Sequence, residues 1–226
     1  MNSTTTTANN RNINEITSDN AQSFIVKNKV AVYTVIGLIV AAIVGFGLFK
    51  QFGEKSQDAY NSKIYTFEST VLKDYLAKPA DTTAAKTLEN GIQNLHLEMG
   101  NYLGLLPVVI KASDALVASS HFAEARSVLA VGEKVSNDDY SDYFIQSRQA
   151  VVFEDMGEDK LAIETLEKMT SKSVKVFEGK TYLDLGRLYL KTGDKTKAKK
   201  NFTYVVEKAK DEAEFVKIAN LYLSKL

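Results

Sequence analysis

The sequence predicts an all-α protein, in which a single N-terminal transmembrane helix is followed by an α-solenoid built from helix pairs. Three observations support this prediction. An uninterrupted apolar run lies near the N-terminus, the composition favours helix along the whole chain, and a pattern of small and large residues recurs in the second half. A stack of paired helices tethered to a membrane accounts for all three.

The composition limits both the fold and the chemistry of the chain. The 226 residues include 28 basic and 28 acidic side chains, so the net charge gives no electrostatic argument for nucleic-acid binding. The absence of cysteine excludes disulfides and thiolate metal sites. Only two prolines, with abundant Ala, Leu, Lys and Glu, favour helix almost everywhere.

The apolar run from Val30 to Phe49 contains twenty residues with no charge and no proline. As a helix it reaches about 30 Å, the thickness of the hydrocarbon core of a bilayer. Backbone polar groups inside lipid must pair within the segment, which requires a helix. Lys27, Lys29 and Lys50 flank the run, where their ammonium groups reach the headgroups. We therefore predict a transmembrane anchor at 26–52, in preference to a buried core helix or a cleaved signal peptide.

The segment before the anchor, residues 1–25, is polar and rich in Thr and Asn, including the run from Thr4 to Thr7. It has too few apolar residues to bury, and we predict a disordered tail.

Two amphipathic helices follow the anchor. The first extends from Ser56 to Lys78 and is limited by Pro79, because the residue before a proline is disfavoured in helical geometry. Asp81 or Thr82 caps the second, and Gly100 ends it. Both helices carry apolar residues three and four apart: Ile64, Phe67, Val71, Leu72, Tyr75 and Leu76 in the first, and Ala85, Leu88, Ile92, Leu95 and Met99 in the second.

An internal repeat organises the rest of the chain. Each unit has a small and a large residue on a first helix, a turn, and another small and large pair on a second helix. Equivalent positions lie 37 and then 36 residues apart. The units carry Ser113, Leu116, Ser120, Ala125 and Leu129; then Ala150, Phe153, Gly157, Ala162 and Leu166; then Gly186, Tyr189, Gly193, Ala198 and Phe202.

The pattern has a direct physical meaning. Small residues let two antiparallel helices approach, and large residues fill the space beside them. Gly157 and Gly193 can end a first helix in the left-handed conformation, whereas the first unit has Ser120 there. We predict helical pairs near 106–135, 143–170 and 179–211; the alternative is an ordinary helical bundle with coincidental spacing.

The ends of the repeat array are less regular. Gly91 and Leu95 lie 34 residues before Ala125 and Leu129, which suggests the second helix of a degenerate earlier unit. After the last unit, residues 212–226 are amphipathic and predict a capping helix that closes the solenoid. Its apolar residues are Phe215, Ile218, Ala219, Tyr222 and Leu226.

This pattern resembles the tetratricopeptide repeat over roughly Leu106–Asp211. In that family the first helix of each pair lines a concave groove that binds protein segments. The resemblance nominates a partner-binding groove of mixed apolar and charged character, which suits an extended or helical peptide. The alternative is that the helix Ser56–Lys78 covers this face and nothing binds there. The groove residues are Ile110, Asp114, Val117, Ser147, Val151, Glu154, Leu183, Arg187 and Leu190.

A second binding feature lies within the anchor. Gly37, Ala41 and Gly45 are four residues apart, so they share one face, against which another membrane helix can pack closely. The alternative is that these small residues reflect only the ordinary composition of spanning helices.

The residues give no support for catalysis. His96 and His121 are the only imidazoles, and we interpret both as surface residues rather than metal ligands or bases. We therefore expect a protein that is not an enzyme and that has no cofactor, no metal, no small-molecule substrate and no nucleic-acid partner. The lysine run Lys191–Lys200 is interpreted as a solvated helix face rather than a lipid or nucleic-acid patch.

The whole arrangement resembles the YfgM family: a short tail, one spanning helix and a tetratricopeptide-like domain extending to the C-terminus. The resemblance implies a single-pass bacterial inner-membrane protein whose soluble domain is periplasmic, an orientation that the flanking lysines alone leave open. It also implies an adaptor that mediates protein–protein interactions, ancillary to the SecYEG translocon and to a membrane-anchored periplasmic chaperone. The alternative function is a general cell-envelope scaffold that assembles another membrane complex.

Overall fold

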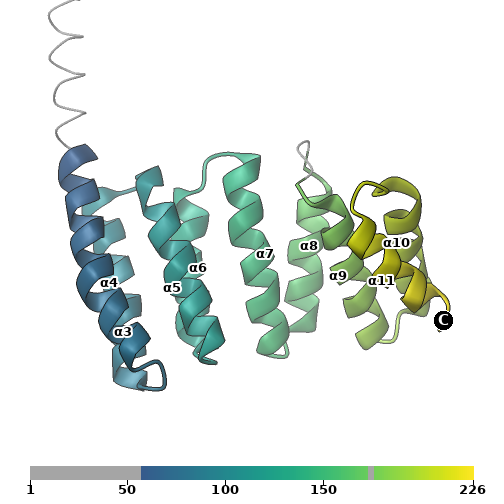
Figure 1. The fold of residues 1–226 in the computed structure, drawn as a ribbon, viewed down its shortest axis with the longest axis horizontal. Coiled ribbons are helices and arrows are strands. Elements are labelled where there is room, and N and C mark those ends of the chain that lie inside the picture. Colours follow the sequence, from purple (N-terminus) through teal and green to yellow (C-terminus); the bar gives the residue numbers. More distant parts are fainter. Residues whose placement is uncertain (1–56, 173–175) are drawn as a thin grey trace, which may run out of the picture. The chain divides into compact units, whose positions relative to one another are not determined.

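Antiparallel helices joined by short turns follow one another along the chain (Figure 1). The computed structural model describes residues 57–172 and 176–226, and these residues are helical with no strand, which confirms the all-α prediction for this part. The predicted tail at 1–25 and the anchor at 26–52, with Gly37, Ala41 and Gly45, lie outside the described residues. Among the helices that the structure describes, none combines the length and the apolar character needed to cross a bilayer.

The first helix occupies residues 57–77 and contains a π-helical stretch, η1 (Glu68–Leu72), that continues into α3 (Lys73–Ala77). The Ser69 and Thr70 hydroxyls both donate to the Thr66 carbonyl oxygen, which lies at the start of the widened turn. The extra residue places buried Phe67 and Leu72 five positions apart instead of four. Leu76, which the sequence pattern placed on the buried stripe, is exposed.

The second helix, α4 (Thr82–Met99), begins as expected with Asp81, whose carboxylate accepts from the Thr83 and Ala84 amides. A Cβ atom on Gly91 would lie 2.3 Å from the Phe67 ring, so α4 and the helix 57–77 approach closely at this glycine. This is the small-against-large contact expected within a helix pair. The helix 57–77 and α4 therefore form a pair that precedes the three repeats.

Three further pairs and a final helix follow. Their bounds are α5 (Leu106–Ala118) with α6 (Phe122–Val135), α7 (Asp139–Asp155) with α8 (Asp159–Thr170), α9 (Glu178–Lys191) with α10 (Lys195–Lys208), and then α11 (Ala213–Leu223). A 3-10 turn, η2 (Leu103–Leu105), leads into α5. Helix α7 begins before the predicted residue 143 because Asp138 and Ser141 form a capping box.

The three turns within the repeats share one hydrogen-bonding pattern. The amide of His121 donates to the Leu116 oxygen at 2.9 Å; the equivalent bonds, Glu158 to Phe153 and Asp194 to Tyr189, are 2.8 Å. The preceding residues Ser120, Gly157 and Gly193 have φ angles of 61°, 76° and 88°. This left-handed C-terminal motif recurs at the spacing that the sequence repeat predicts, which favours a repeat over coincidence.

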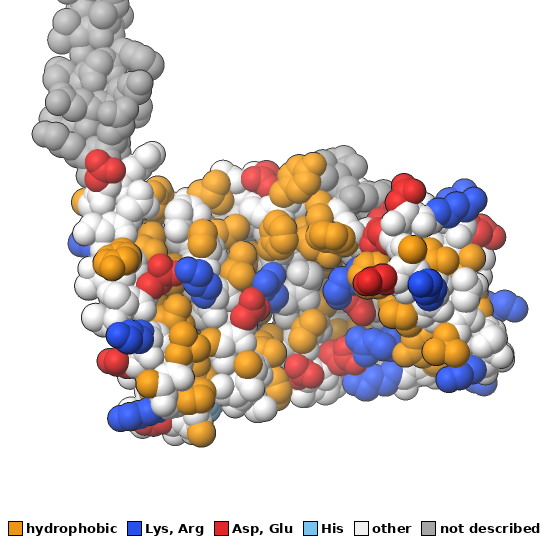
Figure 2. Space-filling view, viewed as in Figure 1, with side chains coloured by type: hydrophobic (Ala, Val, Ile, Leu, Met, Phe, Trp, Pro, Cys, Tyr) orange, Lys and Arg blue, Asp and Glu red, His pale blue; other side chains and the backbone are white. Residues whose placement is uncertain are grey.

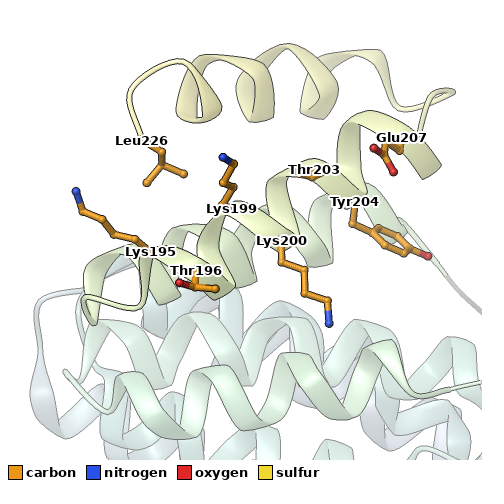
Figure 3. Close-up of a pocket in the computed structure, with 8 residues that line it drawn as sticks. All are labelled: Lys195, Thr196, Lys199, Lys200, Thr203, Tyr204, Glu207 and Leu226. Atoms are coloured by element: carbon orange, nitrogen blue, oxygen red, sulfur yellow. The ribbon is translucent and has the colours of Figure 1, made fainter.

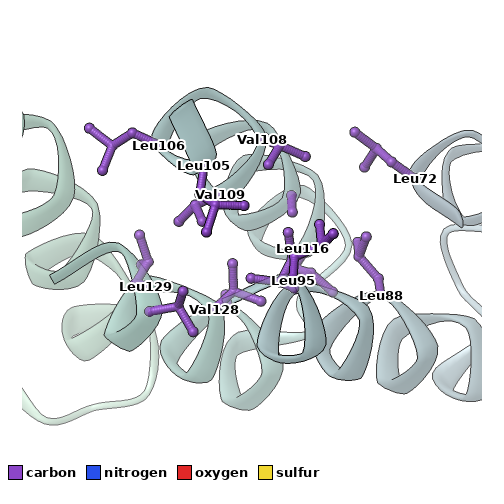
Figure 4. Packing of buried hydrophobic residues seen from close by; sticks show 14 of the residues in the cluster. Leu72, Leu88, Leu95, Leu105, Leu106, Val108, Val109, Leu116, Val128 and Leu129 are labelled. Atoms are coloured by element: carbon purple, nitrogen blue, oxygen red, sulfur yellow. The ribbon is translucent and has the colours of Figure 1, made fainter. Parts of the chain in front are cut away.

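Buried side chains form two clusters that meet at α7. The first fills the space between the helix 57–77, α4, α5 and α6 (Figure 4). It also includes Ile145 and Val152 of α7. The second contains Tyr143 and Ala150 of α7 together with residues of α8, α9, α10 and α11. Helix α7 therefore carries core residues on two faces and joins the two halves of the unit Ala59–Leu226.

The last helix covers the end of the second cluster only partly. Tyr222 stacks on Phe202 with ring centroids 4.7 Å apart, and Ala219 is fully buried. Ile218 and Leu226, both expected on the buried face of the cap, are exposed. Helix α11 is therefore anchored by its Ala219 and Tyr222 side and leaves other apolar residues in solvent.

The antiparallel order defines two edges of the described unit. The edge formed by residues 78–81, 119–121, 156–158 and 192–194 is termed the turn edge. The opposite edge, where the described chain begins at residue 57 and where residues 136–138 and 209–212 lie, is termed the entry edge (Figure 1).

Candidate protein-binding surface

The first helices of successive pairs form one side of the array, termed here the first-helix face: residues 57–77, α5, α7 and α9. The helix 57–77 joins this row because Lys111 of α5 contacts Glu68 at 2.6 Å and the Tyr75 hydroxyl donates to the Ala115 oxygen at 3.5 Å. It pairs with α4 as α5 pairs with α6, so it extends the face instead of covering it.

The structure brings the nine predicted groove residues onto this row with different exposures. Asp114 and Val151 are exposed, whereas Ile110, Val117, Ser147, Glu154, Arg187 and Leu190 are half-buried. Leu183 is only 7% exposed and belongs to the second hydrophobic cluster, so its prediction as a surface contact was wrong. Ile110 and Val117 also pack against the first cluster with part of their surface.

Charged residues of this face pair with one another across neighbouring helices. The Arg148 guanidinium of α7 donates to both oxygens of Asp114 on α5, at 2.7 and 2.9 Å. The Arg187 guanidinium of α9 donates to both oxygens of Glu154 on α7, at 2.5 and 2.6 Å. Together with Glu68–Lys111, these contacts form a ladder of ion pairs that links the four first helices in order.

The ladder changes the electrostatics of the predicted groove. Hydrogen bonding from Arg187 lowers the pKa of Glu154, against an opposing contribution from burial, and the same bond raises the pKa of Arg187. Asp114, Glu154 and Arg187 are therefore committed to contacts within the array. Their charges fix the relation between neighbouring repeats and leave the apolar residues as the groups free to contact a partner.

Arg148 is a charged residue of this face that the sequence interpretation missed. The signal that identifies it is a charge opposite to Asp114 placed 34 residues later, close to one repeat length. The Glu154–Arg187 pair shows the same relation at 33 residues.

Apolar side chains project from α7 on this face. Phe144 is 40% exposed and Val151 is 42% exposed, and their separation of seven residues places them on one side of the helix. Hydrophobic side chains gather in the upper middle of the view in Figure 2, where α7 begins. These two residues form an exposed apolar row on α7. Arg148, which pairs with Asp114, lies between them along the helix.

An aromatic cluster extends this row to the entry edge. The Tyr143 ring lies 5.7 Å from the Phe144 ring and 5.8 Å from the Phe177 ring, centroid to centroid. Burial, with the nearby Asp184 and Glu212 carboxylates, raises the pKa of Tyr143 to about 12, so its hydroxyl stays protonated at neutral pH. Tyr140 and Phe177 are exposed beside it. Exposed aromatic and aliphatic groups framed by ion pairs are typical of protein-binding surfaces.

The two histidines make local contacts. The His121 ring contacts the Pro79 carbonyl oxygen through Nε2 at 3.0 Å and meets the edge of Tyr75, so it is held in place and not freely exposed as predicted. His96 Nδ1 lies 2.9 Å from the Gly100 carbonyl oxygen. Within residues 57–172 and 176–226, no three His, Cys, Asp or Glu side chains gather closely enough to hold a metal ion.

Comparison with known proteins adds no family to these observations: neither a protein-family model nor a curated protein matches the chain.

Proposed function

We propose that the protein is a non-catalytic, membrane-anchored adaptor that binds a segment of another protein on its first-helix face. The observation that carries this proposal is the apolar row of Phe144 and Val151 on α7, exposed between helices whose charges are already paired. The predicted anchor at Val30–Phe49 would tether the chain to a bilayer and raise the effective concentration of membrane-bound partners.

The resemblance to the YfgM family supplies the setting of the proposal. We place the described unit in the periplasm of a bacterium, with the SecYEG translocon and a membrane-anchored periplasmic chaperone as partners. Gly37, Ala41 and Gly45 would pack against a spanning helix of such a partner. A tetratricopeptide-like array of the kind described above is compatible with this role.

Site-specific photo-cross-linking in native membranes tests the proposal. A benzophenone side chain replaces Val151 on the first-helix face, and a control probe replaces Leu161, a similarly exposed aliphatic residue on α8. We expect translocon or chaperone subunits to be cross-linked from position 151 and not from position 161. If position 151 captures other envelope proteins, the general scaffold replaces the translocon role; if both positions capture the same proteins equally, binding on this face is excluded.

The orientation has its own test. A reporter that is active only in the periplasm, fused after Leu226, should be active in cells. Activity of a cytoplasm-specific reporter at the same position would contradict the periplasmic assignment. Substrate turnover by the purified protein, abolished by one substitution, would contradict the non-catalytic assignment.

A further inference from the structure

Helix α10 carries a dense lysine cluster away from the first-helix face. Four lysines, Lys195, Lys197, Lys199 and Lys200, occupy its first six residues, and all four are exposed. The carboxylate nearest in sequence, Asp194, is used to cap the helix by accepting from the Lys197 amide at 2.9 Å. Among the described residues, no carboxylate lies within ion-pair distance of Lys195, Lys199 or Lys200.

The neighbouring lysine, Lys191, differs from the α10 lysines because it has a carboxylate partner. Lys191, which the sequence groups with the same run, contacts Asp159 at 2.6 Å and so belongs to the contacts between repeats. The α10 lysines instead repel one another at the positive end of the helix dipole, which disfavours the folded state slightly. Replacing these lysines with uncharged side chains should therefore not lower the stability of the array.

The surface around the cluster is hollowed on both sides of α10. A cavity of about 600 Å³ is lined by Lys195, Lys199, Lys200, Thr196, Thr203 and Leu226, with Glu207 at one end. Figure 3 shows Leu226 facing the side chains of Lys195 and Lys199 across this space. Cationic, hydroxyl and aliphatic groups thus line a single hollow.

A second hollow of about 440 Å³ lies between α8, α9 and α10 and shares Lys200 and Tyr204 with the first. Its lining adds Asn201, the rings of Tyr182 and Tyr189, and Glu167, whose carboxylate accepts a hydrogen bond from the Tyr189 hydroxyl. Lys197 lies 4.7 Å from the centre of the Tyr189 ring, so this ammonium group is held over an aromatic face. The two hollows share Lys200 and Tyr204 and make one surface over α10, termed here the α10 surface, in which lysine, tyrosine and aliphatic groups outnumber the two carboxylates Glu167 and Glu207.

We propose that the α10 surface is a second binding surface, which takes an acidic polypeptide segment. Lysine ammonium groups would pair with carboxylates of the segment, while Leu226 and the tyrosine rings would contact its aliphatic groups. This mixture suits a polypeptide with alternating acidic and apolar side chains. The proposal holds whether or not the first-helix face binds a partner.

The position of the α10 surface favours a polypeptide over a lipid headgroup. Helix α10 begins at the turn edge, and a helix of its 14 residues extends about 21 Å toward the entry edge. The described chain begins at the entry edge, so these lysines lie about one helix length from the edge at which a preceding membrane anchor would join. A nucleic acid would leave the apolar part of both hollows without a matching group.

The test uses the full-length chain in non-ionic detergent and a fluorescein-labelled glutamate-rich peptide. Fluorescence anisotropy compares the wild type with the triple variant Lys195→Gln/Lys199→Gln/Lys200→Gln. A control triple variant, Lys73→Gln/Lys134→Gln/Lys160→Gln, removes the same charge from exposed lysines on α3, α6 and α8. We expect Kd to rise about tenfold or more in the cluster variant, as for the loss of charge-assisted contacts, and less than about twofold in the control.

The controls make the outcome decisive. The cluster variant should keep the wild-type melting temperature or exceed it, which separates lost binding from lost folding. Equal weakening in both triple variants, or no binding of the peptide by the wild type, would overturn the proposal. Binding of phosphatidylglycerol vesicles or of single-stranded DNA through the α10 lysines, without binding of the peptide, would also overturn it.

Discussion

Ser120 occupies a backbone conformation that two glycines occupy in the equivalent turns. Its φ angle is 61°, and a side chain in the left-handed region costs about 1–2 kcal/mol. Glycine removes this cost but has more freedom to lose on folding. We predict that Ser120→Gly raises the free energy of unfolding by about 0.5–1 kcal/mol in urea titrations of the full-length chain in detergent.

The reciprocal substitution is the control. Gly193→Ser, at a φ angle of 88° with open space around the site, should lower the unfolding free energy by a similar amount. An unchanged or lower stability of Ser120→Gly would show that Ser120 is not strained.

Gly186 illustrates a constraint of space instead of backbone angle. A Cβ atom at this position would lie 2.4 Å from the ring of Phe202, which is fully buried and cannot move aside. We predict that Gly186→Ala lowers the unfolding free energy by about 1–2 kcal/mol, because overpacking outweighs the better helix propensity of alanine.

A double-mutant cycle with Phe202→Leu isolates the cause of this loss. In the Phe202→Leu background the ring is gone, and Gly186→Ala should be neutral or stabilising. The same loss in both backgrounds would show that the contact with Phe202 does not explain the glycine.

Single residues were predictable from the sequence where a local rule decides their place. Asp81 as N-cap depends only on its neighbours in the chain. The predicted exposure of Leu76 and Leu183 was wrong. The exposure of Leu76 depends on the π-helical turn, and that of Leu183 depends on the packing of α9. Arg148 was missed because its partner lies one repeat away.

At the scale of helices, ion pairs set how one repeat sits beside the next. Glu154 and Arg187 join α7 to α9 through two hydrogen bonds. We predict that Glu154→Gln lowers the unfolding free energy at pH 7 by about 1 kcal/mol, near the upper end for partly exposed pairs, measured by urea unfolding.

The pH dependence follows from the direction of the pKa shift. Hydrogen bonding from Arg187 lowers the pKa of Glu154 in the folded state below the ordinary glutamate value of 4.5. The stabilisation is therefore fully present above pH 4.5 and is lost as the pH falls through the folded-state pKa. The difference between wild type and Glu154→Gln should shrink in that range, whereas a constant difference would contradict an ionic origin.

A matched substitution controls for the general effect of removing a carboxylate. Glu164 is exposed on α8, and Glu164→Gln should change the unfolding free energy by less than about 0.5 kcal/mol.

Helices were easier to predict than their contacts. Repeated small residues, with turn glycines in the last two units, identify α5 to α10 because they indicate pairing within one unit. Other contacts join segments that no local pattern connects: the Glu212 carboxylate, after α10, accepts from the Gly179 amide at the start of α9 at 2.8 Å. Such caps depend on the assembled array and cannot be read from the segment that they stabilise.

At the scale of the molecule, α7 is the central helix of the described unit. It contributes to both hydrophobic clusters, supplies partners to both bidentate ion pairs and carries the exposed apolar row. The first-helix face was predictable as a row of helices, because repeats place equivalent helices side by side. Which of its residues remain available to a partner required the structure, since pairing and burial remove several of them.

The most direct test of the proposed adaptor role is the amount of partner protein that two double variants retain. Phe144→Ser/Val151→Ser alters the apolar row, and Leu97→Ser/Leu161→Ser alters exposed aliphatic residues on the second helices α4 and α8. The partner protein is first identified by cross-linking from position 151. The measurement is then the yield of that partner when each full-length variant is purified from native membranes. We predict about a tenfold or greater loss for the first variant and wild-type recovery for the second; undiminished recovery with the first variant would contradict the account.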